Sequence, residues 1–303
     1  MSLGKRLISG SPPPPSQGVD PSGITTSTST IYLTGGTYKF VDFYIDKANG
    51  DKFYYIRNGG FDASRISTGQ MTTAFNASTA LTTGSSTNYS IGYYAGRIAG
   101  KRDGSLIITS GYQNSDNNRY ISEWTIGTSW SVPSSYSNPT SRANAAGGVE
   151  ILILSDDGTK LYYNGGTNLL QNDLSTTFDI STQSYSKTLD LNSVTTDTIV
   201  AWPNNGWRIV NADWFVGGLT LYVLLNEYVG GISGDYRIKA YDTTTAFDIA
   251  NLTDRGNSKD YDCTSFFNGG DPYGKGFCVS DLGHFVIGEQ DVNNGNQNIY
   301  VLS

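Results

Sequence analysis

A tight turn that leads into a strand recurs along this chain, and it restricts the possible folds more than any other feature. The clearest copies begin at Asn49-Gly50, Asp103-Gly104 and Asp157-Gly158, and apolar or alternating residues follow each of them. Weaker copies surround Gly218 and Gly283, so the turn glycines recur at intervals of 54, 54, 60 and 65 residues. Asn-Gly and Asp-Gly favour the positive φ angles of a two-residue hairpin turn, so each copy predicts a β-hairpin.

A second element follows these turns and consists of an aromatic residue, a small polar residue and an aliphatic residue. Its copies are Phe75-Asn76-Ala77, Trp130-Ser131-Val132, Phe178-Asp179-Ile180 and Phe247-Asp248-Ile249. A fifth copy is missing after Gly283, where only 20 residues remain. Placing Ile24 in the aliphatic position completes the series, so we expect the N-terminal segment to complete the last unit and remove an open sheet edge.

Two elements with one shared period of about 50 residues predict an all-β fold, a five-bladed β-propeller closed by an N-terminal strand. The expected blades are residues 36–86, 87–140, 141–193, 194–256 and 257–303, the last completed by 20–35. We assign ring closure to Ile24, Ile31 and Tyr300. The alternative is a β-sandwich in which common turn residues recur by coincidence.

The first 19 residues differ from the rest and are expected to form an extended arm, with residues 20–303 forming the propeller. The residues assigned to anchoring through this arm are Lys5, Arg6, Leu7, Ile8, Pro12, Pro13, Pro14 and Pro15. Consecutive prolines favour the extended polyproline II conformation, which suits docking on a partner protein. The alternative is a disordered tail. The apolar stretch of a signal peptide is absent from this sequence start, so we expect no secretory route.

Composition excludes several classes of protein. The net charge of −7 disfavours binding to nucleic acids and to anionic membranes. Glu occurs only at positions 123, 150, 227 and 289, while Gly occurs 36 times and Tyr 21 times. Strand and turn formers therefore dominate, and large helical domains are not expected. The longest apolar runs are also too short to cross a membrane.

Two segments resemble a known group of repeats. Residues 156–163 are Asp-Asp-Gly-Thr-Lys-Leu-Tyr-Tyr, and residues 172–182 are Asn-Asp-Leu-Ser-Thr-Thr-Phe-Asp-Ile-Ser-Thr. This pattern resembles the DGTKLY…DLSTPWDIST repeats of propeller-like proteins from marine phages and environmental bacteria. The proline that commonly precedes the aromatic residue is replaced here by Thr177 and Ala246. Clear similarity covers about a third of the chain, and the motif carries no catalytic residue.

The resemblance implies a propeller and a phage virion protein. The expected function is therefore a non-enzymatic capsid decoration, fibre or tail-associated subunit, located in the virion and without a cofactor. Its expected partners are other virion proteins, bound through the arm, and host-surface glycans. We expect no nucleic acid partner and no membrane insertion.

Two alternatives involve carbohydrates. Five-bladed propellers include glycosidases, which need a pair of carboxylates, and Glu123 and Glu227 are the candidates although neither lies in a family motif. A lectin would stack sugar rings on aromatic side chains. Trp202 and Trp207 flank a polar turn and are the candidate glycan-binding residues, although tryptophans between blades usually belong to the core.

The remaining reactive side chains favour structural roles. His284 is the single histidine, so any catalytic triad would have to use it, and an ordinary zinc site would lack ligands. We therefore expect no metal. Cys263 and Cys278 are interpreted as two buried thiols, with a disulfide between neighbouring strands as the alternative.

Overall fold

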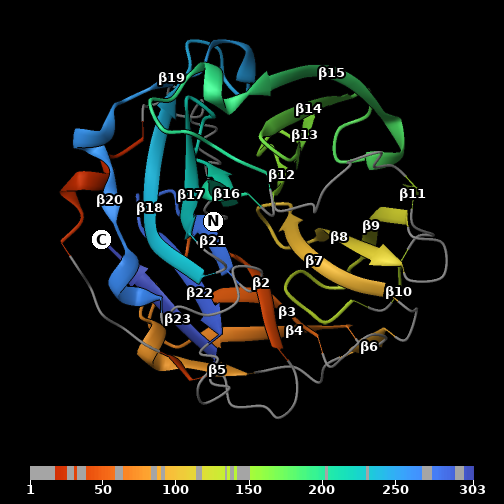
Figure 1. Cartoon of the computed structure of the whole chain (residues 1–303). Coiled ribbons are helices and arrows are strands. Elements are labelled where there is room, and N and C mark those ends of the chain that lie inside the picture. Colours follow the sequence, from red (N-terminus) through yellow and green to blue (C-terminus); the bar gives the residue numbers. More distant parts are fainter. Residues whose placement is uncertain are drawn as a thin grey trace, which may run out of the picture.

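The computed structural model describes residues 18–25, 31–32, 39–58, 64–82, 87–89, 93–113, 118–133, 135–136, 140–141, 151–201, 204–229, 232–267, 275–290 and 297–303. Within these ranges the chain forms β-strands and short 3-10 helices but no α-helix (Figure 1). Five antiparallel sheets surround a common axis, which confirms the predicted five-bladed β-propeller. In the part of the chain that is described, no helix has the length and apolar character needed to cross a membrane.

Each sheet forms one blade, numbered here in chain order. Blade I contains β2 (Lys39–Ile45), β3 (Lys52–Asn58), β4 (Ser64–Met71), β5 (Ala80–Thr82) and β6 (Thr87–Tyr89). Blade II contains β7 (Tyr93–Gly100), β8 (Leu106–Gln113), β9 (Asn118–Thr125), β10 (Ser135–Tyr136) and β11 (Thr140–Ser141). Blade III contains β12 (Leu152–Leu154), β13 (Lys160–Gly165), β14 (Asn168–Leu174) and β15 (Gln183–Asp190).

The last two blades differ in how they are assembled. Blade IV contains β16 (Gly206–Trp214), β17 (Thr220–Val229), β18 (Ile232–Asp242), β19 (Thr253–Asp254) and β20 (Tyr261–Asp262). Blade V contains β21 (Lys275–Val279), β22 (Phe285–Gln290), β23 (Gln297–Leu302) and the N-terminal β1 (Ile31–Tyr32). The 3-10 helices are η1 (Pro21–Gly23), η2 (Ala77–Thr79), η3 (Ile180–Thr182), η4 (Leu191–Ser193), η5 (Ile249–Asn251), η6 (Asn257–Lys259) and η7 (Thr264–Phe266).

The first strands of the five blades contact one another around the axis, in the order β2, β7, β12, β16, β21 and back to β2. At the outer edge of blade V, β1 pairs antiparallel with β23, with Ile31 opposite Ile299. Ile24 and Tyr300 are both partly buried and pack against the same hydrophobic cluster. The two ends of the chain therefore meet in one blade.

Two blade boundaries differ from the expected ones. β6 pairs with β4, so residues 87–89 belong to blade I rather than to blade II. β20 pairs with β18, so residues 261–262 belong to blade IV rather than to blade V. In both cases a segment after the fourth strand returns to the third strand, and the turn pattern carries no signal for this return.

The two repeated sequence elements meet in space. The ring of Phe178 lies over Gly158, where a Cβ atom would come within 2.4 Å of it, and the N–H of Phe178 donates to the Gly158 carbonyl at 2.8 Å. Both residues have positive φ angles, 62° for Phe178 and 69° for Gly158. The same pairing recurs for Gly50, Gly104 and Gly218 with Phe75, Trp130 and Phe247. This contact explains why glycine and aromatic residue recur with one period.

The fifth pairing corrects the predicted position of Ile24. Val19 lies over Gly283, and Pro21 is the buried first residue of η1, as Ile180 is in η3. Asp20 caps this helix by accepting from the Ser22 N–H, as the aspartates before η3 and η5 do. The aliphatic position is therefore held by Pro21, three residues before Ile24. A valine in place of the aromatic residue hides this copy in the sequence.

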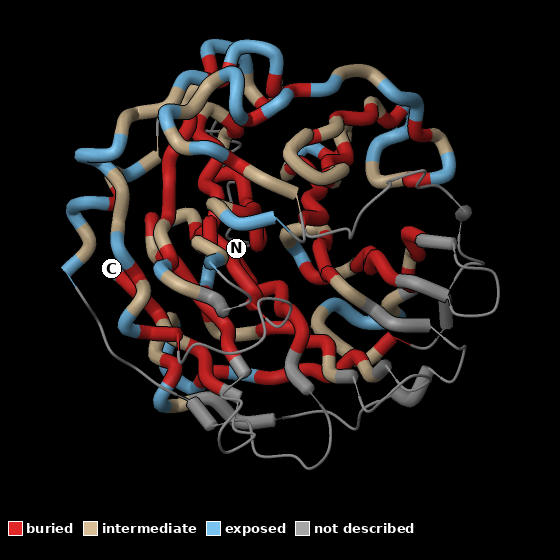
Figure 2. The backbone as a smooth tube through the Cα atoms, in the orientation of Figure 1, coloured by how far each residue is buried: buried red, intermediate tan, exposed pale blue. Residues whose placement is uncertain are grey.

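Buried residues follow the inner and middle strands of the blades (Figure 2). Tyrosine hydroxyls link neighbouring blades: Tyr54 donates to the Gly104 carbonyl at 2.9 Å, and Tyr222 donates to the Val19 carbonyl. Arg255 also donates to the carbonyls of Gly18 and Val19. The N-terminal segment is thus fastened to blade IV as well as to blade V.

Candidate functional site

Polar side chains from three inner strands meet on the propeller axis. Asp42 of β2 accepts from the Asn211 side-chain amide of β16 at 3.1 Å and from the Ile98 N–H of β7 at 3.0 Å. Arg97 of β7 donates to the Val210 carbonyl of β16 at 2.8 Å. All of these side chains are buried. We call Asp42, Arg97 and Asn211 the axial polar layer.

Burial raises the pKa of Asp42 from 3.8 to about 7. The loss of hydration is the largest cause, and it outweighs the opposing effects of the Arg97 charge and of the hydrogen bonds from Ile98 and Asn211. A carboxyl with this pKa exchanges its proton near neutral pH. It is therefore suited to general acid–base chemistry.

Contacts with the neighbouring backbone hold the side chains of Asn211 and Asp42 in place. The Asn211 amide also donates to the Lys275 carbonyl of β21 at 3.3 Å, while its oxygen accepts from the Ala212 N–H at 2.9 Å. Gly276 of β21 approaches Asp42 closely enough that a Cβ atom there would lie 3.1 Å from Oδ1. The rotamer of Asn211 and the approach of β21 thus hold the carboxyl in place.

A second group of charged side chains, Lys47, Asp156 and Asp213, lies near the end of the inner strands. Lys47 donates to Asp213 Oδ1 at 2.7 Å, and Val279 N–H donates to Asp213 Oδ2 at 2.9 Å. The nearby carboxylates raise the pKa of Lys47 despite its burial. Burial raises the pKa of Asp156, which lies close enough to Lys47 to interact with its charge. Asp213 and Lys47 form a buried ion pair, so we interpret this end as structural.

A cavity of about 20 Å³ lies between these two charged groups, lined by residues of all five inner strands. Asn211, Asp213 and Lys47 contribute its polar lining. A space of this size holds about one water molecule and cannot hold a sugar ring. We therefore expect a ligand of Asp42 to approach from the side where the inner strands begin.

The two glutamates named as candidates for a glycosidase lie on different blades, and their role stays a prediction. Glu123 lies on β9 of blade II, where the Ile180 N–H of blade III donates to it and burial raises its pKa. Glu227 lies on β17 of blade IV, opposite Trp207 in the strand register. Neither residue lies on an inner strand, so neither belongs to the axial polar layer.

The structure describes only one of the two tryptophans that were predicted to bind glycans. Trp202 lies outside the described residues, as do all the assigned anchoring residues of the arm. Trp207 is partly buried against the cluster between blades III and IV, and the Arg237 guanidinium lies 4.0 Å from its ring centre. Trp207 thus contacts apolar side chains and an arginine.

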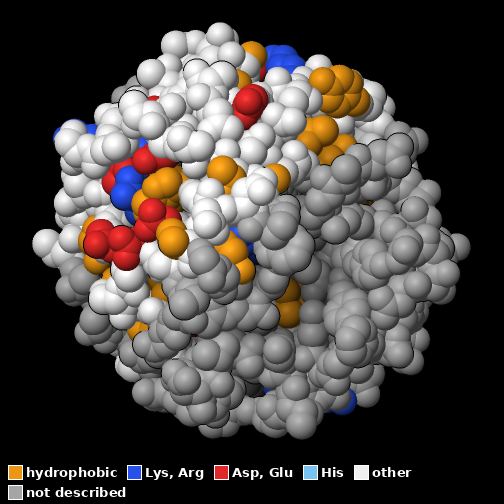
Figure 3. Space-filling view, viewed as in Figure 1, with side chains coloured by type: hydrophobic (Ala, Val, Ile, Leu, Met, Phe, Trp, Pro, Cys, Tyr) orange, Lys and Arg blue, Asp and Glu red, His pale blue; other side chains and the backbone are white. Residues whose placement is uncertain are grey.

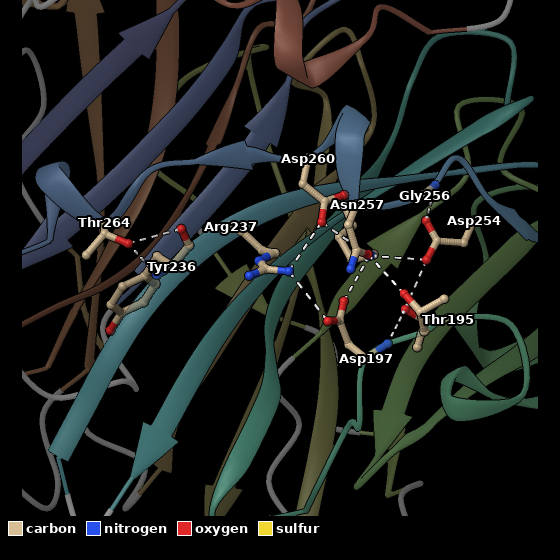
Figure 4. Close-up of polar contacts among 11 residues, drawn as sticks. Thr195, Asp197, Tyr236, Arg237, Asp254, Gly256, Asn257, Asp260 and Thr264 are labelled. Atoms are coloured by element: carbon tan, nitrogen blue, oxygen red, sulfur yellow. Dashed lines mark hydrogen bonds and ion pairs between the residues drawn. The ribbon is translucent and has the colours of Figure 1, made fainter.

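Arg237 belongs to a dense cluster of charges on blade IV (Figure 4). Lys239 is fully buried and donates to Asp197 at 2.9 Å, to Asp260 at 3.2 Å and to the Asn257 oxygen at 2.7 Å. Asp254 lies 3.1 Å from the same ammonium. Acidic and basic side chains gather over this blade on the face seen in Figure 3. The Lys239 ammonium thus links its own strand β18 to Asp197 and to the segment from Asp254 to Asp260. This linkage gives the cluster a structural role.

His284 and the cysteines have structural surroundings. The His284 ring lies 4.7 Å from the ring of Phe75, and burial lowers its pKa. Cys263 and Cys278 are buried free thiols, as interpreted from the sequence, and burial raises the pKa values of both. Across the described ranges, no group of three or more His, Cys, Asp or Glu side chains could hold a metal ion.

The sequence analysis missed the axial polar layer. Asp42 interrupts the apolar run Phe40-Val41-Asp42-Phe43-Tyr44-Ile45, and Asn211 and Asp213 interrupt a similar run in β16. A charged residue in the middle of a buried strand is the signal that could have revealed them.

Two solved structures similar to this chain are family-43 glycoside hydrolases. A thermostable family-43 glycoside hydrolase matches 90% of this chain and 92% of its own, with 10% identity and a TM-score of 0.50. A family-43 β-xylosidase/α-arabinofuranosidase from a compost microbial metagenome, solved with xylotriose, matches 92% of this chain and 94% of its own, with 11% identity and a TM-score of 0.50. No protein-family model and no curated protein sequence matches the chain.

These matches establish the five-bladed propeller fold and change the functional interpretation. The expectation of a non-enzymatic virion protein is contradicted, because the similar structures are carbohydrate-active enzymes. The resemblance to phage repeats, the partners bound through the arm and the virion location stay predictions.

Proposed function

We propose that this chain is a glycoside hydrolase in which Asp42 is one carboxyl of the acid–base pair. One observation carries the proposal: a buried carboxyl on the axis of a five-bladed propeller has its pKa raised to about 7. Glycoside hydrolysis needs a carboxyl that is protonated or ionised as the step requires, near the operating pH.

The neighbours of Asp42 suit this role. Arg97 favours the ionised form and the low-polarity surroundings favour the protonated form, so the carboxyl can hold and release one proton. Asn211 and the Ile98 N–H each bond a different carboxylate oxygen, which fixes the plane of the group. The Phe43 N–H also bonds the carboxyl, so three donors meet its four lone pairs. The remaining lone pair is the one that can meet a glycosidic oxygen or a water molecule.

The similar structures suggest which glycans to test first. Two of them are named for xylosidase, arabinofuranosidase or xylanase activity. Xylo- and arabino-oligosaccharides are therefore the first substrates, with product formation followed by chromatography. We expect hydrolysis with a pH profile whose limb near pH 7 depends on Asp42.

Substitutions then assign the carboxyl. Asp42→Asn should lower kcat about 100- to 10,000-fold and remove the limb near pH 7, because the amide cannot exchange a proton in this range. Asp103→Asn is the matched control, since Asp103 is exposed and bonds its own turn through Ser105. Absence of hydrolysis on the whole panel, or full activity in Asp42→Asn, would refute the proposal.

The second carboxyl is sought among the glutamates. Glu150 lies outside the described residues but directly precedes Ile151 and the inner strand β12 in the sequence. Glu150→Gln is therefore compared with Glu123→Gln and Glu227→Gln. We expect the two non-axial glutamates to be dispensable.

A further inference from the structure

Arg208 is a buried cation whose charge is not neutralised by the described part of the protein. Its side chain is 4% exposed and lies near the start of the inner strand β16. Nη2 donates to the Asn204 carbonyl at 2.9 Å, and the guanidinium lies 3.4 Å from the centre of the Tyr228 ring. Nε and Nη1 are buried without a hydrogen-bond partner, and no carboxylate of the described residues forms an ion pair with the group.

Three buried lysines among the described residues differ from Arg208, because each forms an ion pair. Lys47 has Asp213, Lys275 has Glu289 at 2.7 Å, and Lys239 has three aspartates. A guanidinium that is removed from water without an anion is strongly unfavourable. Its retention at this position is therefore explained most directly by an anionic partner that binds from outside.

The position of Arg208 relates it to the axial polar layer. Arg208 precedes Asn211 by three residues on the same strand, with an irregularity between Ile209 and Asn211, so the two Cα atoms are at most roughly 10 Å apart. Asn211 bonds Asp42, and Arg208 lies toward the start of the strand, the side from which we expect a ligand to approach. Figure 1 shows β16 beside the centre of the ring. A saccharide with one unit at Asp42 can thus place a neighbouring unit near Arg208.

We propose that Arg208 binds the carboxylate of an acidic sugar unit, so that the chain prefers uronic-acid-bearing glycans; this rests on the proposed glycoside hydrolase function. The planar guanidinium and its unused donors match a carboxylate. The Tyr228 ring beneath it leaves the donor edges of the guanidinium for the ligand. Binding requires the Asn204 turn or Tyr228 to shift, because both cover the side chain.

The test measures binding without turnover. The Asp42→Asn protein is titrated by calorimetry with a xylo-oligosaccharide carrying a glucuronic acid branch, and with the same compound after reduction of its carboxyl to an alcohol. We expect the acidic compound to bind about 10- to 100-fold more tightly. Adding Arg208→Met should abolish this difference and leave the affinity for the reduced compound unchanged.

Arg237→Met is the matched control in the same Asp42→Asn protein. Arg237 also stacks on an aromatic ring of blade IV, but Asp197 and Asp260 already balance its charge. The preference for the acidic compound should survive this substitution. Equal binding of the acidic and reduced compounds, or loss of the preference only in Arg237→Met, would overturn the assignment.

Two further measurements separate other roles. Inorganic sulfate should bind much more weakly than the acidic saccharide, and equal binding would show a general anion site instead. Without ligand, Arg208→Met should have an unchanged or higher Tm, because an unpaired buried charge is removed. A clear fall in Tm would show a structural role and contradict the proposal.

The two proposals can fail separately. If no glycan is cleaved but the preference for the carboxylate depends on Arg208, only the hydrolase is refuted. If glycans are cleaved but the carboxylate makes no difference, only the Arg208 assignment is refuted.

Discussion

The wild-type protein should lose stability as the pH rises from about 4 to about 7. Replacing Asp42 by asparagine should remove most of this loss. In the folded protein the pKa of Asp42 is raised from 3.8 to about 7 by burial. Between these values the folded state binds one proton more than the unfolded state, so rising pH favours unfolding. The difference corresponds to about 4 kcal/mol across the window.

The assay is the free energy of unfolding by urea, measured at several pH values from about 4 to about 8. The wild-type protein should lose stability with rising pH at up to about 1.4 kcal/mol per pH unit. Asp42→Asn should be markedly flatter, with a residual slope from Asp156 and Asp260, whose pKa values burial also raises. The amide oxygen can still accept from the Ile98 N–H.

Asp103→Asn is a control of opposite sign. Bonds from Ser105 and Lys101 lower the pKa of Asp103, so its contribution is lost only as the pH falls below about 3.8. Its stability curve between pH 4 and 7 should therefore follow the wild type. If Asp42→Asn also follows the wild type there, Asp42 does not titrate in this window and the reasoning is wrong.

Three further predictions concern the fold. Gly158→Ala should cost more than about 1 kcal/mol in urea unfolding, because φ is 69° and a Cβ atom would meet the Phe178 ring. Deleting residues 1–17 should leave the Tm nearly unchanged, whereas deleting 1–25 should lower it strongly, because residues 18–25 bond blade IV and pack on blade V. Lys239→Met should cost about 3–5 kcal/mol at pH 7, since three buried carboxylates lose their cation, and part of this should return at acidic pH.

Each of these three predictions has a control, or a result that would contradict it. Gly127→Ala should be tolerated because no atom lies within 4 Å of a Cβ there, so equal losses at both glycines would remove the argument from the aromatic contact. Equal melting of the two truncated proteins would show that residues 18–25 do not hold the ring. For Lys239→Met, a cost that does not diminish at low pH would point to lost packing rather than to unpaired carboxylates.

The sequence contains the local information of a propeller in full. Asn-Gly and Asp-Gly turns specify hairpins by their φ angles, and the aromatic residue that recurs after each turn covers that same glycine. The blade number follows from five turn glycines at a regular period. The offset between Ile24 and Pro21 was missed because Val19 replaces the aromatic residue in the fifth copy.

The candidate site was decided by tertiary structure. Asp42 and Asn211 are 169 residues apart in the chain, and only the ring of inner strands brings them within hydrogen-bond distance. The pKa of Asp42 depends on burial, and the unpaired charge of Arg208 depends on which side chains surround it. A sequence specifies turns and strand faces through neighbours along the chain, whereas dielectric surroundings and charge balance depend on residues brought together from different blades. The sequence alone therefore determined the architecture, and the packing of the blades determined where a carboxyl titrates near neutral pH and where a cation lacks its partner.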